Sequence, residues 1–232
     1  MVPIDNLEKL RRKSPTEVNR PIHFGGSTLD RRAHICAFFN NPDEEYRVLL
    51  PFVKEGLALG QKSVHTVDPR LRNDRCRRLA SAGVDVERVI RNGQFELRDW
   101  SDTHLCGGNF DQDKTLALFR QVMDNARQKG FPLARFATNM EWALEADLDA
   151  NALLEYEAKA NYAWIQQDGP THPVLCTYDL SRFTADIIVD VMRTHPMVIL
   201  GGLLRENPFF VPPDEFLDEL RNRKPIRLQK VG

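Results

Sequence analysis

"HICAFFNNPDEEYRVLLPFVKEGLALGQKSVHTVD", residues 34–68, is the stretch of sequence that decides the fold. It opens with a short apolar run, residues 34–39, of the kind that forms a buried central strand. Apolar residues at helical spacing follow, and residues 63–68 are typical of a second strand. Pro51 interrupts the helical pattern, so the sequence predicts a kinked helix or two short helices between the strands.

The segment "GLALGQKS", residues 56–63, nearly spells the phosphate-binding loop G-x-x-x-x-G-K-[ST], with one extra residue before the lysine. A true loop of this kind follows a strand and opens a helix, because the helix N-terminus holds the phosphates. Here a helix precedes and a strand follows, so the glycines predict a helix C-terminus and a turn, with Lys62 facing solvent. The position after the first strand holds Asn40 and Asn41, which can cap a helix, and the acidic residues 43–45. Those carboxylates would repel a triphosphate, so we expect no canonical nucleotide hydrolysis.

The rest of the chain alternates strand and helix patterns, and helices of ten or more residues are common among them. This alternation predicts an α/β fold, a three-layer sandwich whose mostly parallel sheet has helices on both faces. Further strands are expected at residues 95–100 (near an edge), 132–138, 173–180 and 197–202, and helices at residues 69–83, 111–130, 139–144, 150–167 and 184–195.

Composition describes an ordinary globular protein of 232 residues, with 42% hydrophobic residues, 28% charged residues and a net charge of −1. We expect a cytoplasmic protein with no membrane partner, since the sequence has neither an apolar run of about 20 residues nor a signal-peptide pattern. Residues 1–30 are interpreted as an extension or docking arm, residues 31–213 as one domain, and residues 214–232 as a basic tail suited to an acidic partner. The basic run at residues 70–78 lacks interleaved aromatics, so we expect no direct DNA binding.

Ligands in open parallel sheets bind beyond the carboxyl ends of the strands, and this rule favours a set of rim residues: Asn40, Asp68, Asn139, Glu141, Trp142 and Asp179. His34 and Cys36 lie two residues apart on the first strand, so their side chains are expected to share one face near its start. Trp142 and Tyr178 would form a wall, Glu141 or His34 would supply a hydrogen-bonding group, and Cys36 or Cys176 a soft contact. Each residue has an ordinary structural alternative: Trp142 and the cysteines as core residues, and His195 as a helix C-terminal cation. Tyr156 and Glu157 are interpreted as helix-surface or packing residues. The candidate set is His34, Cys36, Asn40, Asp68, Asn139, Glu141, Trp142, Cys176, Tyr178, Asp179 and His195.

Cysteine and histidine residues raise two chemical alternatives. The four cysteines include no C-x-x-C pair, so we expect free thiols rather than disulfides or a zinc finger. His34, Cys36, Cys176 and His195 are ligand types that suit zinc or iron, but their spacing is not diagnostic. No motif activates a cysteine as a nucleophile. The sequence therefore predicts no catalytic residue, no cofactor and no metal ligand.

Six blocks of sequence, taken in order, resemble the MEDS family, the methanogen/methylotroph sensory domain named after a dichloromethane-responsive regulator. The resemblance runs from about residue 34 to residue 213 and implies a RecA/KaiC-like scaffold with a degenerate phosphate loop. It also implies that the domain senses small organic molecules, alone or beside histidine kinase, STAS or DNA-binding modules. The blocks are residues 34–68, 107–144, 153–159, 174–183, 192–202 and 206–210.

These observations lead to one main hypothesis and two alternatives. The main one is a non-catalytic sensory domain for signal transduction and transcription regulation, which binds a small organic molecule. Because the sequence shows no kinase, receiver or helix-turn-helix pattern, the signal would pass to a protein partner such as a kinase or regulator. The alternatives are an enzyme or metal-binding protein with a Cys/His site on an eroded ATPase scaffold, and an interaction module without a ligand. The oligomeric state is left open, a homo-oligomer included.

Overall fold

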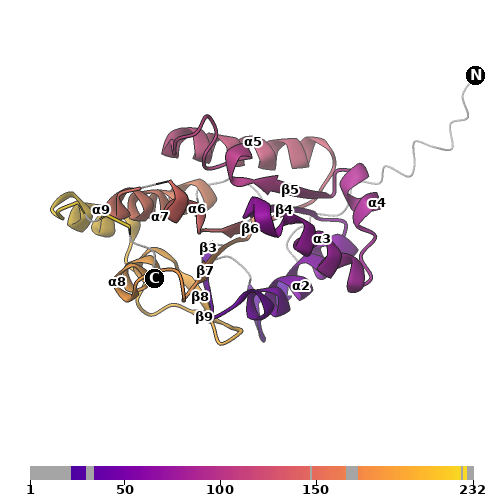
Figure 1. Ribbon diagram of the computed structural model, residues 1–232, viewed down its shortest axis with the longest axis horizontal. Coiled ribbons are helices and arrows are strands. Elements are labelled where there is room, and N and C mark those ends of the chain that lie inside the picture. The colour runs from indigo at the N-terminus through magenta and orange to yellow at the C-terminus, as the bar shows by residue number, and fades with distance from the viewer. Residues whose placement is uncertain (1–21, 30–33, 147, 166–171, 226, 229–232) are drawn as a thin grey trace, which may run out of the picture.

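The computed structural model describes residues 22–29, 34–146, 148–165, 172–225 and 227–228. Within these residues a seven-stranded sheet forms the centre of the molecule (Figure 1). All neighbouring strands are parallel except the last pair, so the prediction of a mostly parallel sheet is confirmed. In spatial order the strands are β5 (Phe95–Asp99), β4 (Lys62–Val67), β6 (Ala134–Asn139), β7 (Val174–Asp179), β3 (His34–Phe39), β8 (Met197–Leu200) and β9 (Leu203–Glu206).

Helices cover both faces of the sheet because the central strands are apolar on both sides. On β3, Cys36 and Phe38 point to one face, and Ile35 and Phe39 to the other. Figure 1 shows α5 and α7 on one side of the strands and α2 on the other. The first face packs against α5 (Gln112–Gln128), α6 (Trp142–Glu145), α7 (Ala150–Ile165), α8 (Ala185–Thr194) and α9 (Pro213–Arg221), and the second against α2 (Pro42–Ala58), α3 (Arg72–Ser81) and α4 (Val86–Arg91).

Helix α2 and the turn after it explain the near-match to a phosphate loop. Asn41 caps the helix through a bond from the Glu44 amide, and the helix continues through Pro51, so two short helices were a wrong alternative. Gly60 follows the helix with φ +69°, the left-handed conformation typical of a helix C-terminus. The expectation that Lys62 faces solvent was wrong. Its ammonium is buried because β4 pairs with β5, where it donates to Glu96 at 2.5 Å and to the Gly93 carbonyl at 2.6 Å.

Several short elements were absent from the sequence interpretation. A hairpin of β1 (Ile22–Phe24) and β2 (Ser27–Leu29) ends the expected N-terminal arm and packs on α2 and β9. The expected basic tail contains α9, whose Phe216 and Leu220 are buried against the neighbouring helices. Two 3-10 turns, η2 (Pro69–Leu71) and η3 (Trp100–Asp102), follow β4 and β5. Among the described helices, none has the length and apolar character that a membrane crossing requires.

Candidate functional site

Glu157 is the most unusual residue of the core, because its carboxylate is completely buried. It lies on the face of α7 that covers β3 and β7, one turn from Leu153 and Asn161, which are also buried. Helical spacing of three and four residues puts all three side chains on one face. Sequence analysis interpreted Glu157 as a helix-surface or packing residue, whereas the structure places its charge at the centre of a polar group inside the molecule.

Three further side chains converge on this carboxylate, and together the four form what we call the internal cluster: His34, Glu157, Cys176 and His195. The carboxylate Oε2 lies 3.2 Å from Nε2 of His34 and 3.4 Å from Nε2 of His195. The sulfur of Cys176 lies 3.5 Å from His34 Nε2 and 3.7 Å from Glu157 Oε2. One donor atom from each residue lies within 4.8 Å of the others, and all four residues are buried. The cluster therefore joins β3, β7, α7 and the residue that follows α8.

Hydrogen bonds fix which nitrogen of His34 carries the proton. The Asn161 amide nitrogen donates to the carbonyl oxygens of Glu157, Ala158 and Thr194, so its amide oxygen is the atom that faces His34 Nδ1 at 3.3 Å. An amide oxygen only accepts, so His34 Nδ1 carries the hydrogen. In the neutral ring, Nε2 then has no hydrogen, and its lone pair points into the cluster.

His195 is oriented in the same way by its own helix. Its Nδ1 lies 2.9 Å from the carbonyl oxygen of Val191, which is also an acceptor. The hydroxyl of Thr194 donates to that carbonyl too, so a hydroxyl lone pair is left for the ring N–H. The hydrogen of His195 is therefore on Nδ1, and the two rings, with centroids 4.0 Å apart, both present Nε2 to Glu157.

Burial sets the protonation states within the cluster. It lowers the pKa of His34, and the neighbouring His195 lowers that pKa further against the opposing effect of Glu157. Burial alone would raise the pKa of the Glu157 carboxyl, but the two imidazoles bring that pKa below its ordinary value. Burial and the Glu157 charge raise the pKa of the Cys176 thiol well above 9.0. The protein alone thus places a neutral imidazole and a neutral thiol beside a carboxylate.

Two predicted residues border the cluster. Cys36 shares a face with His34, as expected, and is the register partner of Cys176, but its thiol faces the Met197 carbonyl at 3.6 Å. Tyr178 donates its hydroxyl to Glu157 Oε1 at 2.5 Å, and the same residue belongs to the lining of a second site described next. Tyr178 is therefore shared between two regions of the molecule.

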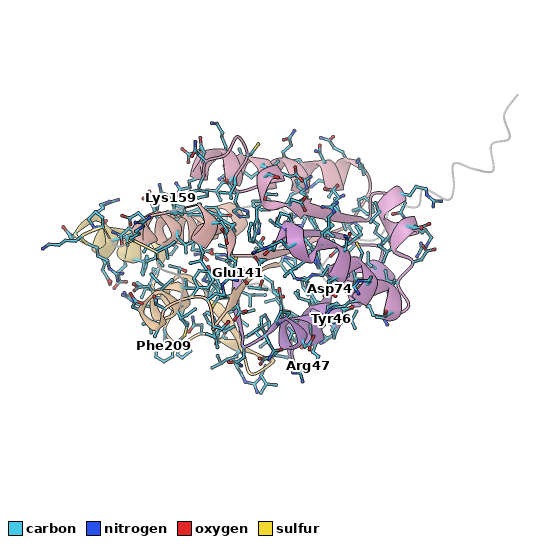
Figure 2. All side chains as sticks on the ribbon, in the orientation of Figure 1. Tyr46, Arg47, Asp74, Glu141, Lys159 and Phe209 are labelled. Carbon is cyan, nitrogen blue, oxygen red and sulfur yellow. The ribbon has the colours of Figure 1, made fainter. Side chains whose placement is uncertain are left out.

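The second region is a pocket at the carboxyl ends of β6 and β7, which we call the edge pocket. Its cavity volume is about 20 Å³, and the surrounding space of about 290 Å³ includes open solvent. Glu141, which Figure 2 labels near the centre of the molecule, contributes to it from the turn after β6. Of the predicted residues it includes Asn139, Glu141, Tyr178 and Asp179. Its complete lining is Phe39, Asn41, Pro42, Glu45, Leu71, Asn139, Glu141, Thr177, Tyr178 and Asp179.

The carboxylates of the edge pocket have partners within the protein. Arg182 lies 3.1 Å from Glu141, and Arg75 lies 3.3 Å from Glu45. Burial raises the pKa of Glu141, although Arg182 opposes that effect. The amide nitrogen of Asn139 faces Glu141 Oε1 at 3.4 Å, which leaves its amide oxygen buried and without a hydrogen-bond partner among the described residues. The pocket therefore presents one free acceptor, the Asn139 amide oxygen, beside paired carboxylates and apolar side chains.

Three predicted residues lie outside both regions. Asn40 is exposed, and its backbone and side-chain amides donate to Glu44. Asp68 is buried in a bidentate pair with Arg70. Trp142 is fully buried, with its ring stacked 4.5 Å from His104 in an aromatic group of the core, so it forms no wall of the pocket. The structural alternative therefore describes Trp142.

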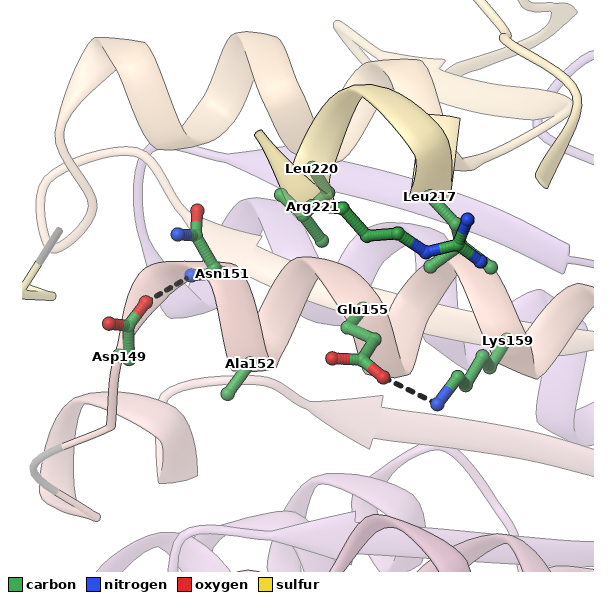
Figure 3. A pocket seen from close by; sticks show the side chains of 8 residues that line it. All are labelled: Asp149, Asn151, Ala152, Glu155, Lys159, Leu217, Leu220 and Arg221. Atoms are coloured by element: carbon green, nitrogen blue, oxygen red, sulfur yellow. Dashed lines mark hydrogen bonds and ion pairs between the residues drawn. The ribbon is translucent and has the colours of Figure 1, made fainter. Parts of the chain in front are cut away.

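A larger and more open hollow lies between α7 and α9 (Figure 3), but its charges are paired locally. Lys159 points toward Glu155 one turn away on α7, and Arg221 pairs with Asp218 on α9. The backbone amide of Asn151 is satisfied by Asp149 at 2.7 Å. The lining of this hollow, which also includes Ala152, Leu217 and Leu220, has one buried acceptor without a hydrogen-bond partner, Asn151 Oδ1. Among the described residues no further free polar group converges with it.

Sequence reasoning missed Glu157, Asn161, Glu45 and Thr177. The signal for Glu157 and Asn161 was present in "ALLEYEAKAN", where they share a helical face with leucine and alanine. A charged residue on an apolar helix face is rarely buried without a partner. That rule indicates a polar site under the helix, although it does not identify the partner strands.

Comparison with known proteins places these residues in a family. Residues 33–196, more than half of the chain, match the family model described as "MEDS: MEthanogen/methylotroph, DcmR Sensory domain". A curated relative, the "Transcriptional repressor DcmR" of Methylorubrum extorquens, is 24% identical over 195 residues. That alignment covers 82% of this chain and 66% of the repressor, so the chain spans slightly less than two thirds of its relative.

Proposed function

We propose that this chain, which belongs to the MEDS sensory-domain family, binds a small organic molecule in the edge pocket and reports its presence to a regulatory protein. The observation that carries the proposal is the buried amide oxygen of Asn139, which has no partner among the described residues and belongs to the pocket lining. A buried acceptor without a hydrogen bond is costly, by about 1–3 kcal/mol, so a ligand that donates to it gains affinity.

The lining indicates the chemistry of the ligand. The acceptors are Asn139, Glu141 and Asp179, and apolar contact comes from Phe39 and Leu71. Such a pocket favours a small molecule with an apolar part and a hydrogen-bond donor, such as a short-chain alcohol or amine. Carboxylates of the lining repel anions, and this is consistent with the absence of a phosphate-binding motif in the sequence.

The cysteines support a non-catalytic role. A reactive cysteine requires a lowered thiol pKa and access to a substrate. Cys36 and Cys176 are both buried, and burial together with the charge of Glu157 raises the pKa of each thiol well above 9.0. Neither thiol is therefore an activated nucleophile.

The name of the curated relative supports a regulatory output for this chain. It is named as a transcriptional repressor, and the matched part of this chain corresponds to the sensory family model. We propose that ligand binding at the edge pocket changes the contact of this domain with a transcription regulator or a signalling kinase. Helix α2 is suited to transmit that change, since its first turn supplies Pro42 and Glu45 to the pocket.

A thermal-shift screen followed by calorimetric titration tests the proposal. The panel contains short-chain alcohols, amines, ketones and carboxylic acids, with ATP–Mg²⁺ as a separate probe. Alcohols or amines should stabilise the protein, and Asn139→Ala or Glu141→Gln should weaken their binding by about tenfold. Glu215→Gln, an exposed acid on α9, is the matched control and should bind as the wild type does.

Two outcomes would overturn the assignment. Stabilisation by ATP–Mg²⁺ alone would indicate that a nucleotide site survives. Binding of an alcohol or amine that is unchanged in both pocket variants would place the ligand elsewhere in the protein.

A further inference from the structure

We infer that the internal cluster is a binding site for a divalent transition-metal ion of the zinc type, held by His34, Glu157, Cys176 and His195. Imidazole, thiolate and carboxylate are the ligands that zinc takes in proteins. Here they come from four separate elements and converge within 4.8 Å without any lysine or arginine paired to Glu157 among the described residues.

Four of the six distances between the ligand atoms match the edges of a tetrahedron around a metal ion, and the other two are within 4.8 Å. Ligand atoms about 2.0–2.3 Å from a tetrahedral zinc lie about 3.3–3.7 Å from one another. The separations are 3.2 and 3.4 Å for the two nitrogen–oxygen pairs. They are 3.5 Å for the sulfur–nitrogen pair and 3.7 Å for the sulfur–oxygen pair. Only small side-chain movements would be needed to bring all four atoms to coordination distance.

Both histidines are already fixed in the tautomer that a metal requires. The Nδ1 hydrogens are held by Asn161 Oδ1 and by the carbonyl oxygen of Val191. Partners of this kind orient metal-binding imidazoles in proteins and leave Nε2 as the ligand atom. These hydrogen bonds from the two Nδ1 atoms are already formed without the ion.

The cluster is unsatisfied without a cation. Both Nε2 lone pairs face Glu157 Oε2, which is itself an acceptor, so three acceptors meet at one point. The Cys176 thiol brings one hydrogen, which Glu157 Oε2 or His34 Nε2 can accept. Nε2 of His195, 3.4 Å from Glu157 Oε2, is left without a hydrogen bond in the structure. A divalent ion satisfies all three atoms together.

Charge balance also favours a divalent ion. Binding to Cys176 releases the thiol proton to solvent and forms a metal–sulfur bond, so the protein supplies one thiolate and one carboxylate. Two negative ligands and two neutral imidazoles make the loaded site electrically neutral, which is what a fully buried site requires. Four protein ligands leave no open position, so the ion would tie α7 to the sheet rather than bind a substrate.

Cobalt titration of the chelator-treated full chain tests the inference. Co²⁺ should bind one per chain, with the visible absorption bands of tetrahedral cobalt and a sulfur-to-cobalt charge-transfer band. Zn²⁺ should displace it and should raise the melting temperature. Cys176→Ser should abolish the charge-transfer band, and His195→Asn should weaken binding by more than about 100-fold.

Cys36→Ser is the matched control, because Cys36 is a buried cysteine and the register partner of Cys176 on the next strand. It should retain the charge-transfer band. A band lost in Cys36→Ser but retained in Cys176→Ser would overturn the ligand assignment. Folded wild-type protein that takes up neither Co²⁺ nor Zn²⁺ would overturn the site itself.

X-ray absorption of the cobalt-loaded wild type decides the question if Cys176→Ser does not fold. One sulfur and two imidazole scatterers are expected around the metal, and a shell of oxygen and nitrogen alone would contradict the inference. Glu141→Gln should bind the metal normally, so failure of the metal site and failure of the edge pocket can be distinguished.

Discussion

The internal cluster and the edge pocket both contain buried carboxylates, but they neutralise them in different ways. In the pocket, Glu141 is paired with Arg182 and Glu45 with Arg75. In the cluster, Glu157 meets two imidazoles, a thiol and a phenol, and none of them carries a permanent positive charge. The first arrangement is balanced by the protein's own arginines, while the second is not.

This difference indicates which kind of guest each region suits. A pocket whose charges are already paired can exchange a neutral or weakly polar molecule without disturbing the fold. A buried carboxylate whose donors are only a phenol and a thiol is stabilised by a cation that stays in place, because neither donor neutralises its charge. Tyr178 belongs to both regions, so occupancy of one can affect the other.

The largest expected effect separates the two carboxylates. Glu157→Gln in metal-loaded protein should lower the free energy of unfolding by about 3–5 kcal/mol, because it breaks a buried charged group. Glu141→Gln should change it by less than about 1 kcal/mol, since burial already disfavours the charged form of Glu141 and Arg182 is partly exposed. Urea denaturation of both variants measures the difference. Equal losses would contradict the distinction between the regions.

The next largest expected effect is the loss of stability in acid that is caused by buried histidines outside both regions. Burial lowers the pKa of His65 and of His104 to about 3, from 6.5 in the unfolded chain. Their stabilising contribution is therefore complete above about pH 6.5 and is lost as the pH falls toward about 3, because the unfolded chain binds the protons first. When the pH is lowered from about 7 to about 5, each of these two histidines should reduce the free energy of unfolding by about 2 kcal/mol.

The acid effect is checked by denaturation at both pH values. His104→Gln should be less stable at neutral pH but should show a smaller loss on acidification. The exposed His23→Gln is the control and should keep the wild-type pH dependence. An unchanged dependence in His104→Gln would show that His104 does not contribute to the acid sensitivity.

Local patterns predicted the fold well because the central strands and the long helices are strongly patterned. The strand at residues 34–39, and the helix that ends at Ala58 before the Gly60 turn, were both predicted from the sequence. Strand β9 and helix α4 were missed because they are short and depend on packing for their stability. The burial of Lys62 could not be predicted, since it depends on which strand lies beside β4.

The candidate sites were predicted in pieces rather than as groups. Alternation along a strand correctly put His34 beside Cys36 on one face, and the rule of carboxyl ends selected Glu141 and Asp179 for the pocket. The order of strands in the sheet is not written in local patterns, so the approach of His195 and Cys176 to one point could not be derived. Glu157 was missed because a glutamate on an amphipathic helix usually faces water.

Tyr178→Phe should lower the free energy of unfolding by less than the changes above, and it tests the link between the internal cluster and the edge pocket. It removes the hydroxyl that donates to the Glu157 carboxylate and keeps the ring, so the loss should be about 1.5 kcal/mol, as for a bond to a charged group. Tyr156→Phe is the matched control. Its hydroxyl bonds to His104, a neutral partner, and the loss should be less than about 1 kcal/mol. Equal losses by urea denaturation would indicate that Glu157 is not ionised.

The smallest expected effect concerns Arg182. Its removal should leave the edge pocket, like the internal cluster, with a buried carboxylate that has no arginine partner. Arg182→Met leaves Glu141 without its ion pair, and the stability loss at neutral pH should be less than about 1 kcal/mol, because Arg182 is partly exposed. The pKa of Glu141, already raised by burial, should rise further when the arginine is absent. Below that pKa the protonated carboxyl needs no cation, so the difference from wild type should disappear on acidification.

Arg120→Met, which replaces an exposed arginine on α5, should show no such pH dependence. A loss that persists at acid pH would mean that Arg182 stabilises the fold by packing, and the pocket would then not depend on arginine for its charge balance.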